Sequence, residues 1–374
     1  MPPGHLPGGG SSPTFERYRA VTQSWWLSPA RPLSVAARQQ ALRRLDQLTK
    51  PRGSLGLMEE LVAHLAAMQD TPIPSVDPGW ITVFAGDHGV ARAGVSAYPQ
   101  AVTTEMIRNF SRGGAAITVL ARQQGIPFEV VDVGAVTDPG PLPWVISNRV
   151  GEGTSDFRFE PAMTPNQLYS ALDAGRSAVK RALAAGSRLF IGGEMGIGNT
   201  TASAAITVAL LGLPPESVAG PGTGIDEAGM ARKAAIIQEA WTQNEMYLTS
   251  PLEILRCLGG FEIAALCGAY IHCAQKGLPI LVDGVICTAA ALVVITLHPA
   301  MKDWMIFTHR SSEPGQLPIL RAIAKHPILD LQMRLGEGSG AAVAFSILRL
   351  ACALQQDMST FEEAAVSRET GSHE

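Results

Sequence analysis

The sequence predicts an α/β protein with a parallel sheet flanked by helices, and three observations point to this class. From about residue 79, short apolar runs bounded by glycine alternate with alanine-rich stretches long enough to form helices. The short runs are apolar throughout, as expected of strands that are buried on both faces of a sheet. The chain also holds 38 glycines, which suits many tight turns between strands and helices.

The first part of the chain predicts a tail followed by helices. Residues 1–13 are rich in Pro, Gly and Ser, and we expect residues 1–34 to form a disordered or irregular tail. Residues 35–78 are expected to hold helices of a small helical domain. The segments 36–48 and 57–68 carry apolar residues at three- and four-residue spacing and are separated by a Pro-Arg-Gly break.

Strands and helices then alternate through a large α/β catalytic domain expected at 79–340. The expected strands are 80–85, 128–133, 188–191, 280–282 and 305–308. The expected helices lie near 101–124, 164–185, 200–212, 227–246, 252–276, 285–297 and 315–325. We expect a last helix at 341–358, and the polar residues 359–374 are expected to form a flexible tail.

Four polar clusters follow expected strands. They are Asp87-His88, the segment around Glu194, Asp283-Gly284, and residues 308–315. Right-handed crossovers between parallel strands place the carboxyl ends of those strands along one edge of the sheet. Ligands bind at that edge in open α/β sheets. The sequence therefore predicts an active site there.

The segment 191–201 has the order of a strand, a glycine turn and a helix start. Its glycines at 192, 193, 196 and 198 allow the backbone to approach an anion, which the N–H groups of the helix's first turn would face. Their spacing matches neither a P-loop nor a GxGxxG fingerprint. Glu194 adds a carboxylate, so we expect a phosphate to anchor the substrate while Glu194 takes part in acid–base chemistry. An ordinary tight turn with a solvated glutamate is the alternative.

Glu337 lies between two glycines just before the last helix, and it has two interpretations. Carboxylates are favoured near helix N-termini, so one interpretation of Glu337 is a helix cap. The other interpretation is a general base on a flexible collar, with the glycines leaving room for a flat substrate ring. The sequence alone leaves both open.

Further candidates also have a structural and a functional interpretation. Asp87-His88 suggests a metal or charge-relay pair, but no second His lies at metal-ligand spacing, which favours a hydrogen-bonded loop. Ser311 has no Gly-x-Ser-x-Gly frame, which favours a phosphate-binding hydroxyl over a nucleophile. Lys233 lies in an expected helix capped by Asp226, either on its solvated face or as a point charge for a substrate phosphate.

Composition argues against several classes of protein. A formal net charge of −4 and a pI near 6.1, with no basic cluster, argue against a nucleic-acid partner. No apolar run reaches the roughly 18–20 residues of a membrane span, and no signal peptide is visible, so we expect a cytoplasmic protein. The five cysteines lack metal-ligand spacing and are expected to be buried as small apolar residues.

Together these motifs resemble one family, the nicotinate-nucleotide–dimethylbenzimidazole phosphoribosyltransferases of the lower-ligand branch of cobalamin synthesis. The resemblance covers residues 35–355. It rests on eight motifs in the family's order, at 48–56, 85–90 with 94–99, 112–117, 193–201, 259–264, 283–284, 309–315 and 334–340. The implied fold is a large Rossmann-like α/β domain with a smaller helical domain built from both chain ends, assembled as a homodimer.

The resemblance also implies a reaction and a set of residues. Phosphoribose moves from nicotinate mononucleotide to 5,6-dimethylbenzimidazole, without a cofactor or metal. Glu337 matches the general base, and Glu194 matches a second active-site carboxylate. The nucleotide- and phosphate-binding positions are Gly193, Gly196, Gly198, Asn199, Thr200, Lys233, Ser311 and Gly338. The acceptor-base positions are Ser96, Tyr98, Glu105, Met106 and Leu335, and the supporting loops hold Asp87, His88 and Asp283.

Two positions depart from the family's pattern. Pro221 stands where another residue is expected, and Glu105 replaces a Gln associated with the base pocket, which leaves the base preference open. A related phosphoribosyltransferase with another base or a phenol as acceptor is the alternative activity. A non-catalytic nucleotide-binding protein has no need of two carboxylates. A nicotinamide-dependent oxidoreductase would be expected to carry the GxGxxG fingerprint, which is missing.

Overall fold

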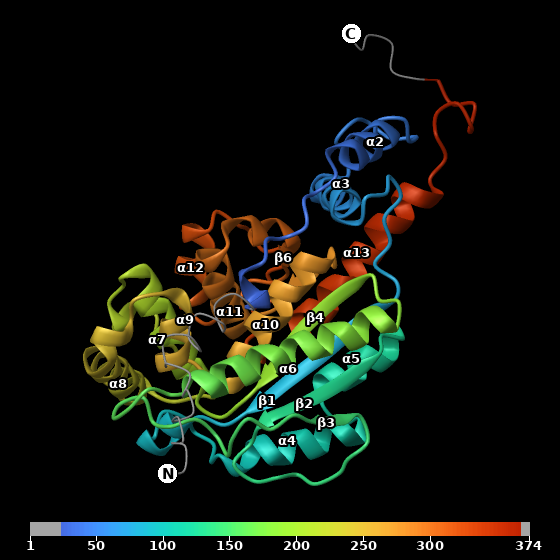
Figure 1. Cartoon of the computed structure of the whole chain (residues 1–374). Coiled ribbons are helices and arrows are strands. Elements are labelled where there is room, and N and C mark those ends of the chain that lie inside the picture. Colours follow the sequence, from blue (N-terminus) through green and yellow to red (C-terminus); the bar gives the residue numbers. More distant parts are fainter. Residues whose placement is uncertain (1–23, 368–374) are drawn as a thin grey trace, which may run out of the picture.

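The protein, described here by a computed structural model over residues 24–367, is built on one six-stranded parallel sheet (Figure 1). The strands are β1 (Gly79–Gly86), β2 (Phe128–Gly134), β3 (Val145–Ser147), β4 (Leu189–Met195), β5 (Ile280–Val282) and β6 (Met305–Phe307). Their order in the sheet is β3-β2-β1-β4-β5-β6. This is the order of doubly wound nucleotide-binding sheets, in which the chain changes direction between β1 and β4.

The predicted α/β class is confirmed, and five of the six strands lie where the sequence predicts them. The sixth, β3, was not predicted, because it has three residues at the sheet edge, none of them buried. The sequence prediction also ends β4 too early. It continues through Met195, so Gly193 and Glu194 belong to the strand, and the turn proper starts at Gly196.

Helices cover both faces of the sheet. Adjacent strand residues point to opposite faces, and the pair Gly192 and Gly193 shows what each face carries. A Cβ on Gly192 would meet Leu266 and Tyr270 of α10 (Phe261–Lys276), whereas one on Gly193 would meet the segment before α13 (Ser339–Asp357). Helix α6 (Pro165–Ala184) packs on α10, and α5 (Ala116–Gln124) packs on α13.

Two of the predicted helices are broken in the structure. The segment 101–124 forms α4 (Ala101–Arg112) and α5, because Gly113 ends the first helix with a φ of 77°. The segment 252–276 forms α9 (Pro251–Leu258) and α10, separated by two glycines. The other five are found close to their predicted positions: α6, α7 (Asn199–Leu211), α8 (Glu227–Asn244), α11 (Val285–Leu297) and α12 (Gln316–Ala322).

Helices from the first and last parts of the described chain lie together beyond one end of the sheet (Figure 1). Helices α2 (Val35–Leu45) and α3 (Leu57–Gln69) pack on each other, and α3 packs on α13. The Arg44 guanidinium donates to the carbonyls of Gln355 and Gln356, at 2.8 and 2.9 Å. These two bonds join α2 to the end of α13.

Both predicted tails lie partly within the described residues. Residues 24–34 contain a short helix, η1 (Trp25–Leu27), and Trp25 and Trp26 pack against the core. After α13, Thr360 pairs with Leu48, and the Phe361 N–H donates to the Gln47 carbonyl at 2.9 Å. The chain beyond α13 is therefore attached rather than free up to this point. The rest of both predicted tails, residues 1–23 and 368–374, lies outside the described residues.

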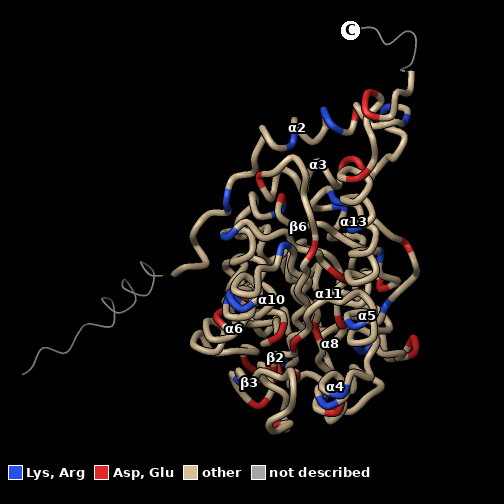
Figure 2. The backbone as a smooth tube through the Cα atoms, turned by 90° about the vertical axis from the view of Figure 1, so that its right-hand side faces the viewer, with Lys and Arg blue, Asp and Glu red and all other residues tan. Residues whose placement is uncertain are grey.

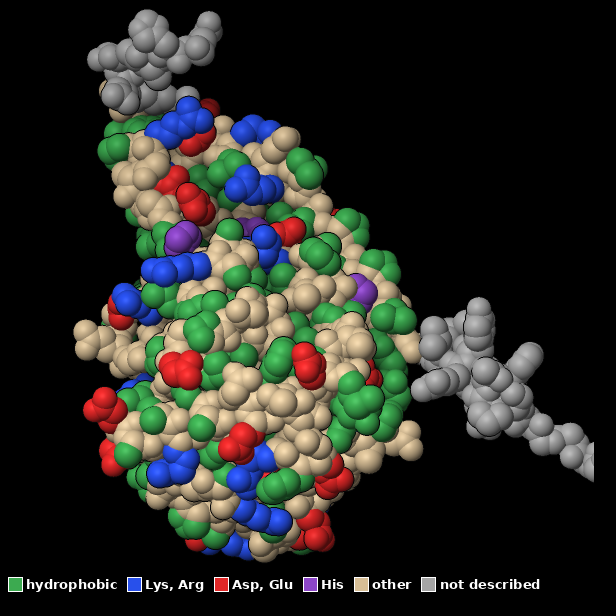
Figure 3. All heavy atoms as spheres, turned by 90° about the vertical axis from the view of Figure 1, so that its left-hand side faces the viewer, with side chains coloured by type: hydrophobic (Ala, Val, Ile, Leu, Met, Phe, Trp, Pro, Cys, Tyr) green, Lys and Arg blue, Asp and Glu red, His purple; other side chains and the backbone are tan. Residues whose placement is uncertain are grey.

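Basic and acidic residues are interspersed along the backbone in Figure 2, and the side of the molecule seen in Figure 3 has no basic face. Among the described residues, no helix is long and apolar enough to cross a membrane. All five cysteines are buried and free. In residues 24–367, no group of three or more His, Cys, Asp or Glu side chains is placed to hold a metal ion.

Candidate active site

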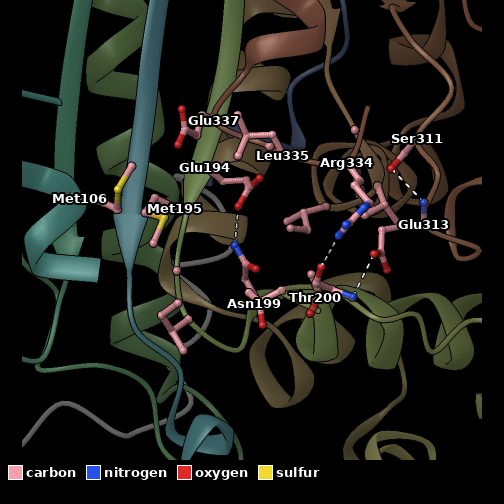
Figure 4. A pocket seen from close by; sticks show the side chains of 18 of the residues that line it. Met106, Glu194, Met195, Asn199, Thr200, Ser311, Glu313, Arg334, Leu335 and Glu337 are labelled. Atoms are coloured by element: carbon pink, nitrogen blue, oxygen red, sulfur yellow. Dashed lines mark hydrogen bonds between the residues drawn. The ribbon is translucent and has the colours of Figure 1, made fainter. Parts of the chain in front are cut away.

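A cavity of about 490 Å³ opens at the carboxyl edge of the sheet, where the predicted clusters follow their strands. It is lined by nine of the predicted site residues: Tyr98, Met106, Glu194, Gly196, Asn199, Thr200, Ser311, Leu335 and Glu337. Figure 4 shows the glutamates with Leu335, Met106 and Met195 at one end and Thr200, Ser311, Glu313 and Arg334 at the other. We call these the carboxylate end and the arginine end.

Glu194 is held at the end of β4 with its side chain in the cavity and only 5% exposed. The Asn199 amide, at the start of α7, donates to its Oε2. Burial, followed by the charges of Asp283, Glu262 and Glu337, raises the pKa of Glu194 well above its ordinary value. Burial in this cavity therefore favours the protonated form of Glu194 over its carboxylate. It is not a solvated turn residue.

Glu337 lies on a collar, residues 336–338, in which every residue has a positive φ: 88° for Gly336, 65° for Glu337 and 83° for Gly338. This backbone aims the Glu337 side chain into the cavity, where it is 5% exposed. Burial raises the pKa of Glu337 to about 7. The N–H of Ile117, which donates to Oε2 at 3.4 Å, acts in the other direction and lowers this pKa. A carboxylate with this pKa is suited to accept a proton near neutral pH.

Two glycines allow the two glutamates to lie in the same cavity. A Cβ on Gly193 would collide with the backbone carbonyl of Glu337, so the collar passes directly over β4. A Cβ on Gly336 would collide with the carboxylate of Glu194. Gly193 and Gly338 do not line the cavity, and their place in the structure is this close packing of backbone. Glu337 therefore needs a glycine at position 193, next to Glu194, and Glu194 needs a glycine at position 336, next to Glu337.

The collar is fixed by Asp283, which follows β5. Its two carboxylate oxygens accept the N–H groups of Gly338, at 3.2 Å, and Ala341, at 2.8 Å. Asp283 therefore caps α13, and the helix has no cap bond from its own sequence neighbours. The capping interpretation of Glu337 is accordingly wrong. His309 lies 3.4 Å from Asp283, and although burial favours its neutral form, this carboxylate raises the pKa of His309 above the ordinary value.

At the arginine end, α7 begins with Asn199 and Thr200 in the cavity wall, after Gly198, which has a φ of 101°. Lys233 of α8 reaches the same wall from behind. It is 1% exposed and donates to the Gly220 carbonyl at 2.9 Å and to Thr200 Oγ1 at 3.3 Å. Burial lowers its pKa to about 8. The interpretation of Lys233 as a solvated residue is wrong.

The predicted acceptor-base residues are only partly brought together. Tyr98, Met106 and Leu335 line the cavity. Ser96 lies beside the cavity, with its hydroxyl 3.0 Å from that of Thr223. Glu105 is exposed and does not line the cavity. The change from the family's Gln to Glu at this position therefore has no visible role in the cavity.

The Asp87-His88 segment lies behind the cavity and is a hydrogen-bonded loop, as predicted. Asp87 accepts the Thr103 hydroxyl at 2.6 Å, and the same Thr103 oxygen accepts the N–H of Ile197 in the turn after β4. His88 Nε2 lies 2.6 Å from Glu262, with both side chains fully buried. This loop supports the turn that leads into α7.

Several cavity residues are not among the individual site residues predicted from the sequence. They are Val102, Met195, Ile197, Gly222, Thr223, Gly284, Val285, Ile286, His309, Glu313, Arg334 and Gly336. His309, Glu313 and Arg334 lie inside motifs that carry the family resemblance, so their position was a signal. Gly222 and Thr223 lie in a segment noted only for its proline. Apolar side chains such as Val102 carry no chemical signature.

A parallel sheet with two buried carboxylates and a helix N-terminus at its carboxyl edge defines an α/β enzyme with a cavity suited to a nucleotide. Residues 30–366 match a family model described as "Phosphoribosyltransferase". The chain is 55% identical over 348 residues to the nicotinate-nucleotide–dimethylbenzimidazole phosphoribosyltransferase of Azotobacter vinelandii, covering 93% of this chain and 99% of that protein. The chain belongs to the nicotinate-nucleotide–dimethylbenzimidazole phosphoribosyltransferase family.

Other relatives agree. An enzyme of the same name from Pseudomonas aeruginosa strain UCBPP-PA14 is 55% identical over 347 residues, covering 93% of this chain and 99% of that one. The crystal structure of CobT from Thermus thermophilus superposes with a TM-score of 0.84 at 44% identity. It covers 89% of this chain and 99% of that chain.

Proposed function

We propose that this chain transfers the phosphoribosyl group of nicotinate mononucleotide to 5,6-dimethylbenzimidazole. The products are nicotinate and α-ribazole 5′-phosphate, the nucleotide of the lower ligand in cobalamin synthesis. The names of the relatives support these substrates. The observation that carries the proposal is Glu337, a buried cavity carboxylate whose pKa is raised to about 7.

The reaction breaks one bond to the ribose C1′ and forms another. Glu337 takes the N–H proton of the benzimidazole while the other ring nitrogen attacks C1′ from the face opposite the leaving nicotinate. The C1′–N bond of the pyridinium breaks with its electron pair going to nicotinate, so the anomeric centre changes from β to α. Positive charge develops on the ribose in the transition state, and a nearby carboxylate stabilises it.

The arginine end suits the 5′-phosphate. Thr200 and Ser311 offer hydroxyl groups, and the start of α7 offers N–H groups. Lys233 and Arg334 supply positive charge beside these groups. Glu194 lies between this end and Glu337 (Figure 4), and its protonated form, which burial favours, can donate a hydrogen bond to a ribose hydroxyl. A phosphoribose bound in this direction presents its C1′ to the carboxylate end.

The carboxylate end suits a flat apolar base. Val102, Met106, Met195 and Leu335 supply an apolar wall, and Tyr98 adds an aromatic ring. Methionine side chains adapt to differently shaped rings, which leaves room for related benzimidazoles. Holding both substrates in line supplies much of the rate, because attack on C1′ has to come from one side.

We further propose the arrangement of the chain that the family resemblance implies. Residues 79–340 form a Rossmann-like catalytic domain, while 35–78 and 341–358 form a small helical domain. Two copies assemble as a homodimer in the cytoplasm. Light scattering coupled to gel filtration tests the dimer, and a mass of one chain, 39.5 kDa, would exclude it.

The activity is tested by incubating the protein with nicotinate mononucleotide and a panel of acceptors: 5,6-dimethylbenzimidazole, benzimidazole, adenine and phenol. Chromatography with mass spectrometry identifies the products, and NMR assigns the anomer. We expect α-ribazole 5′-phosphate from dimethylbenzimidazole. Glu152→Gln, which changes an exposed glutamate, is the matched control for Glu337→Gln. Absence of product with dimethylbenzimidazole, or a β product, would refute the proposal.

A further inference from the structure

A glycine-rich segment links the two ends of the cavity. We call residues 220–224 the glycine strap. Two of its members, Gly222 and Thr223, line the cavity. Gly222 has a φ of 53° and Gly224 a φ of 112°, a backbone that side chains other than glycine rarely adopt.

At the arginine end the strap is held by three charged side chains. The Lys233 ammonium donates to the Gly220 carbonyl at 2.9 Å, and the Gly222 N–H donates to Glu313 Oε1 at 2.9 Å. The Arg334 guanidinium donates to the Gly222 carbonyl at 3.4 Å. Hydrogen bonds to charged groups are stronger than those between neutral groups, so the strap is fixed at this end.

At its other side the strap holds the loop of the proposed acceptor site. Thr223 Oγ1 accepts the Ala97 N–H at 3.0 Å and lies 3.0 Å from Ser96 Oγ. Ser96 Oγ in turn accepts the N–H of Tyr98 at 3.2 Å. Tyr98 lines the cavity, and its ring is half exposed. One hydroxyl of the strap therefore fixes three successive residues of this loop.

We propose that Thr223 is a positioning residue for the acceptor base, and this inference rests on the proposed function. Thr223 sets the positions of Ser96 and Tyr98 relative to the glycine strap, and the strap is itself fixed at the arginine end, where the phosphate is proposed to bind. The distance between the phosphate end and the wall of the acceptor site is thereby determined by one short segment. Removing the Thr223 hydroxyl releases the acceptor loop without touching the groups that would bind the nucleotide.

A role in stability alone predicts something different. Thr223 is exposed, so water replaces the lost hydrogen bonds in a variant, and surface changes of this kind alter stability little. If the hydrogen bonds of Thr223 served only the fold, removing them would leave both Michaelis constants unchanged. A positioning role raises the KM for the base and leaves the KM for nicotinate mononucleotide in place.

The test is steady-state kinetics on Thr223→Val, which keeps the shape and removes the hydroxyl. We expect the KM for dimethylbenzimidazole to rise about tenfold, because the base then has to order the released loop when it binds. The KM for nicotinate mononucleotide, kcat and the Tm should stay close to wild type. Thr223→Ser, which restores the hydroxyl, should restore the KM. Thr242→Val, on the exposed side of α8, is the matched control.

A double-mutant cycle adds an independent readout. Because Ser96 and Thr223 act through one contact, Ser96→Ala combined with Thr223→Val should raise the KM for the base less than the product of the two single effects. If the two substitutions multiply their effects on the KM for the base, or if Thr223→Val leaves that KM unchanged while the wild type is active, this inference is wrong but the proposed function stands. A wild type that uses no base would overturn the proposed function and this inference with it.

Discussion

The substitution Glu337→Gln is the sharpest test of the proposed base, because it keeps the shape of the side chain. Glutamine can still accept the Ile117 N–H, which donates to Oε2 at 3.4 Å in the wild type. It cannot take a proton from the acceptor base. We therefore expect kcat to fall by about 10²–10⁴, as for other positioned general bases, with little change in the KM for the nucleotide.

The pH profile follows from the pKa of Glu337, which burial raises from 4.5 to about 7. Only the ionised form accepts a proton, so wild-type kcat should rise about tenfold per pH unit below 7 and level off above it. The residual activity of Glu337→Gln should lack this rise. The comparison is made on the same buffer series with nicotinate mononucleotide saturating.

The free energy of unfolding should fall as pH rises, whereas kcat rises. Below about pH 4 the carboxyl is protonated in both states, and Glu337 contributes no pH dependence. As pH rises from 4.5 to 7, the unfolded chain releases this proton first, so the folded state loses stability. A shift from 4.5 to about 7 corresponds to about 3 kcal/mol at pH 8. Glu337→Gln is spared this cost, so its stability relative to wild type should increase from pH 5 to pH 8.

Denaturant unfolding at pH 5 and pH 8 measures this difference, with Glu152→Gln as the control for removing an exposed glutamate. A helix-capping role predicts a loss of about 1 kcal/mol and nearly normal turnover. Near-wild-type kcat together with lowered stability at pH 8 would refute Glu337 as the base.

Four further predictions concern the rest of the site. Lys233→Ala should mainly raise the nucleotide KM, and in the wild type that KM should rise above pH 8, where Lys233 loses its proton; an unchanged KM removes Lys233 from the phosphate site. Glu194→Ala combined with Glu337→Gln should be slower than either single variant, measured by kcat, because alanine cannot donate the hydrogen bond to the ribose, and equality would mean that Glu194 takes no part. Gly193→Ala should lower kcat more than the nucleotide KM changes, because its methyl group displaces the Glu337 backbone; normal kcat would show that the collar adapts. Replacing the buried cysteines by Ala or Ser, one at a time, should preserve kcat, and a folded variant without turnover would reveal a nucleophile.

The position of the site could be predicted from the sequence, because it follows from the chirality of parallel sheets. Once Asp87, Glu194, Asp283 and residues 308–315 each follow a strand, the crossover rule brings them to one edge. The details of each strand could not be predicted in the same way. Glycine is a poor strand residue, so the sequence predicts a turn from Gly192 onward. In the structure β4 continues because these glycines admit α10 on one face and the collar on the other.

Lys233 shows a second limit of the sequence. A lysine inside a helix is most often solvated, and nothing in the neighbouring residues indicates otherwise. Its burial follows from the strap, which comes before it in the chain and folds back over its ammonium group. Thr223 was missed for the same reason, since its partners Ser96 and Ala97 are 127 and 126 residues away. Contacts of this length carry no local pattern.

The collar explains why the sequence leaves two roles open for Glu337, a helix cap and a general base, and why the structure excludes the cap. A carboxylate just before a helix is expected to cap it, but Asp283, 55 and 58 residues away from its two partners, takes the N–H groups at the start of α13. Glu337 is thereby released from the helix. It also keeps a φ of 65°, which is unfavourable for a residue with a side chain and persists only where the surroundings enforce it. A residue that stabilised the helix would not need this backbone, whereas a base aimed into a cavity does, so the strain at Glu337 and the long-range cap at Asp283 have a common explanation.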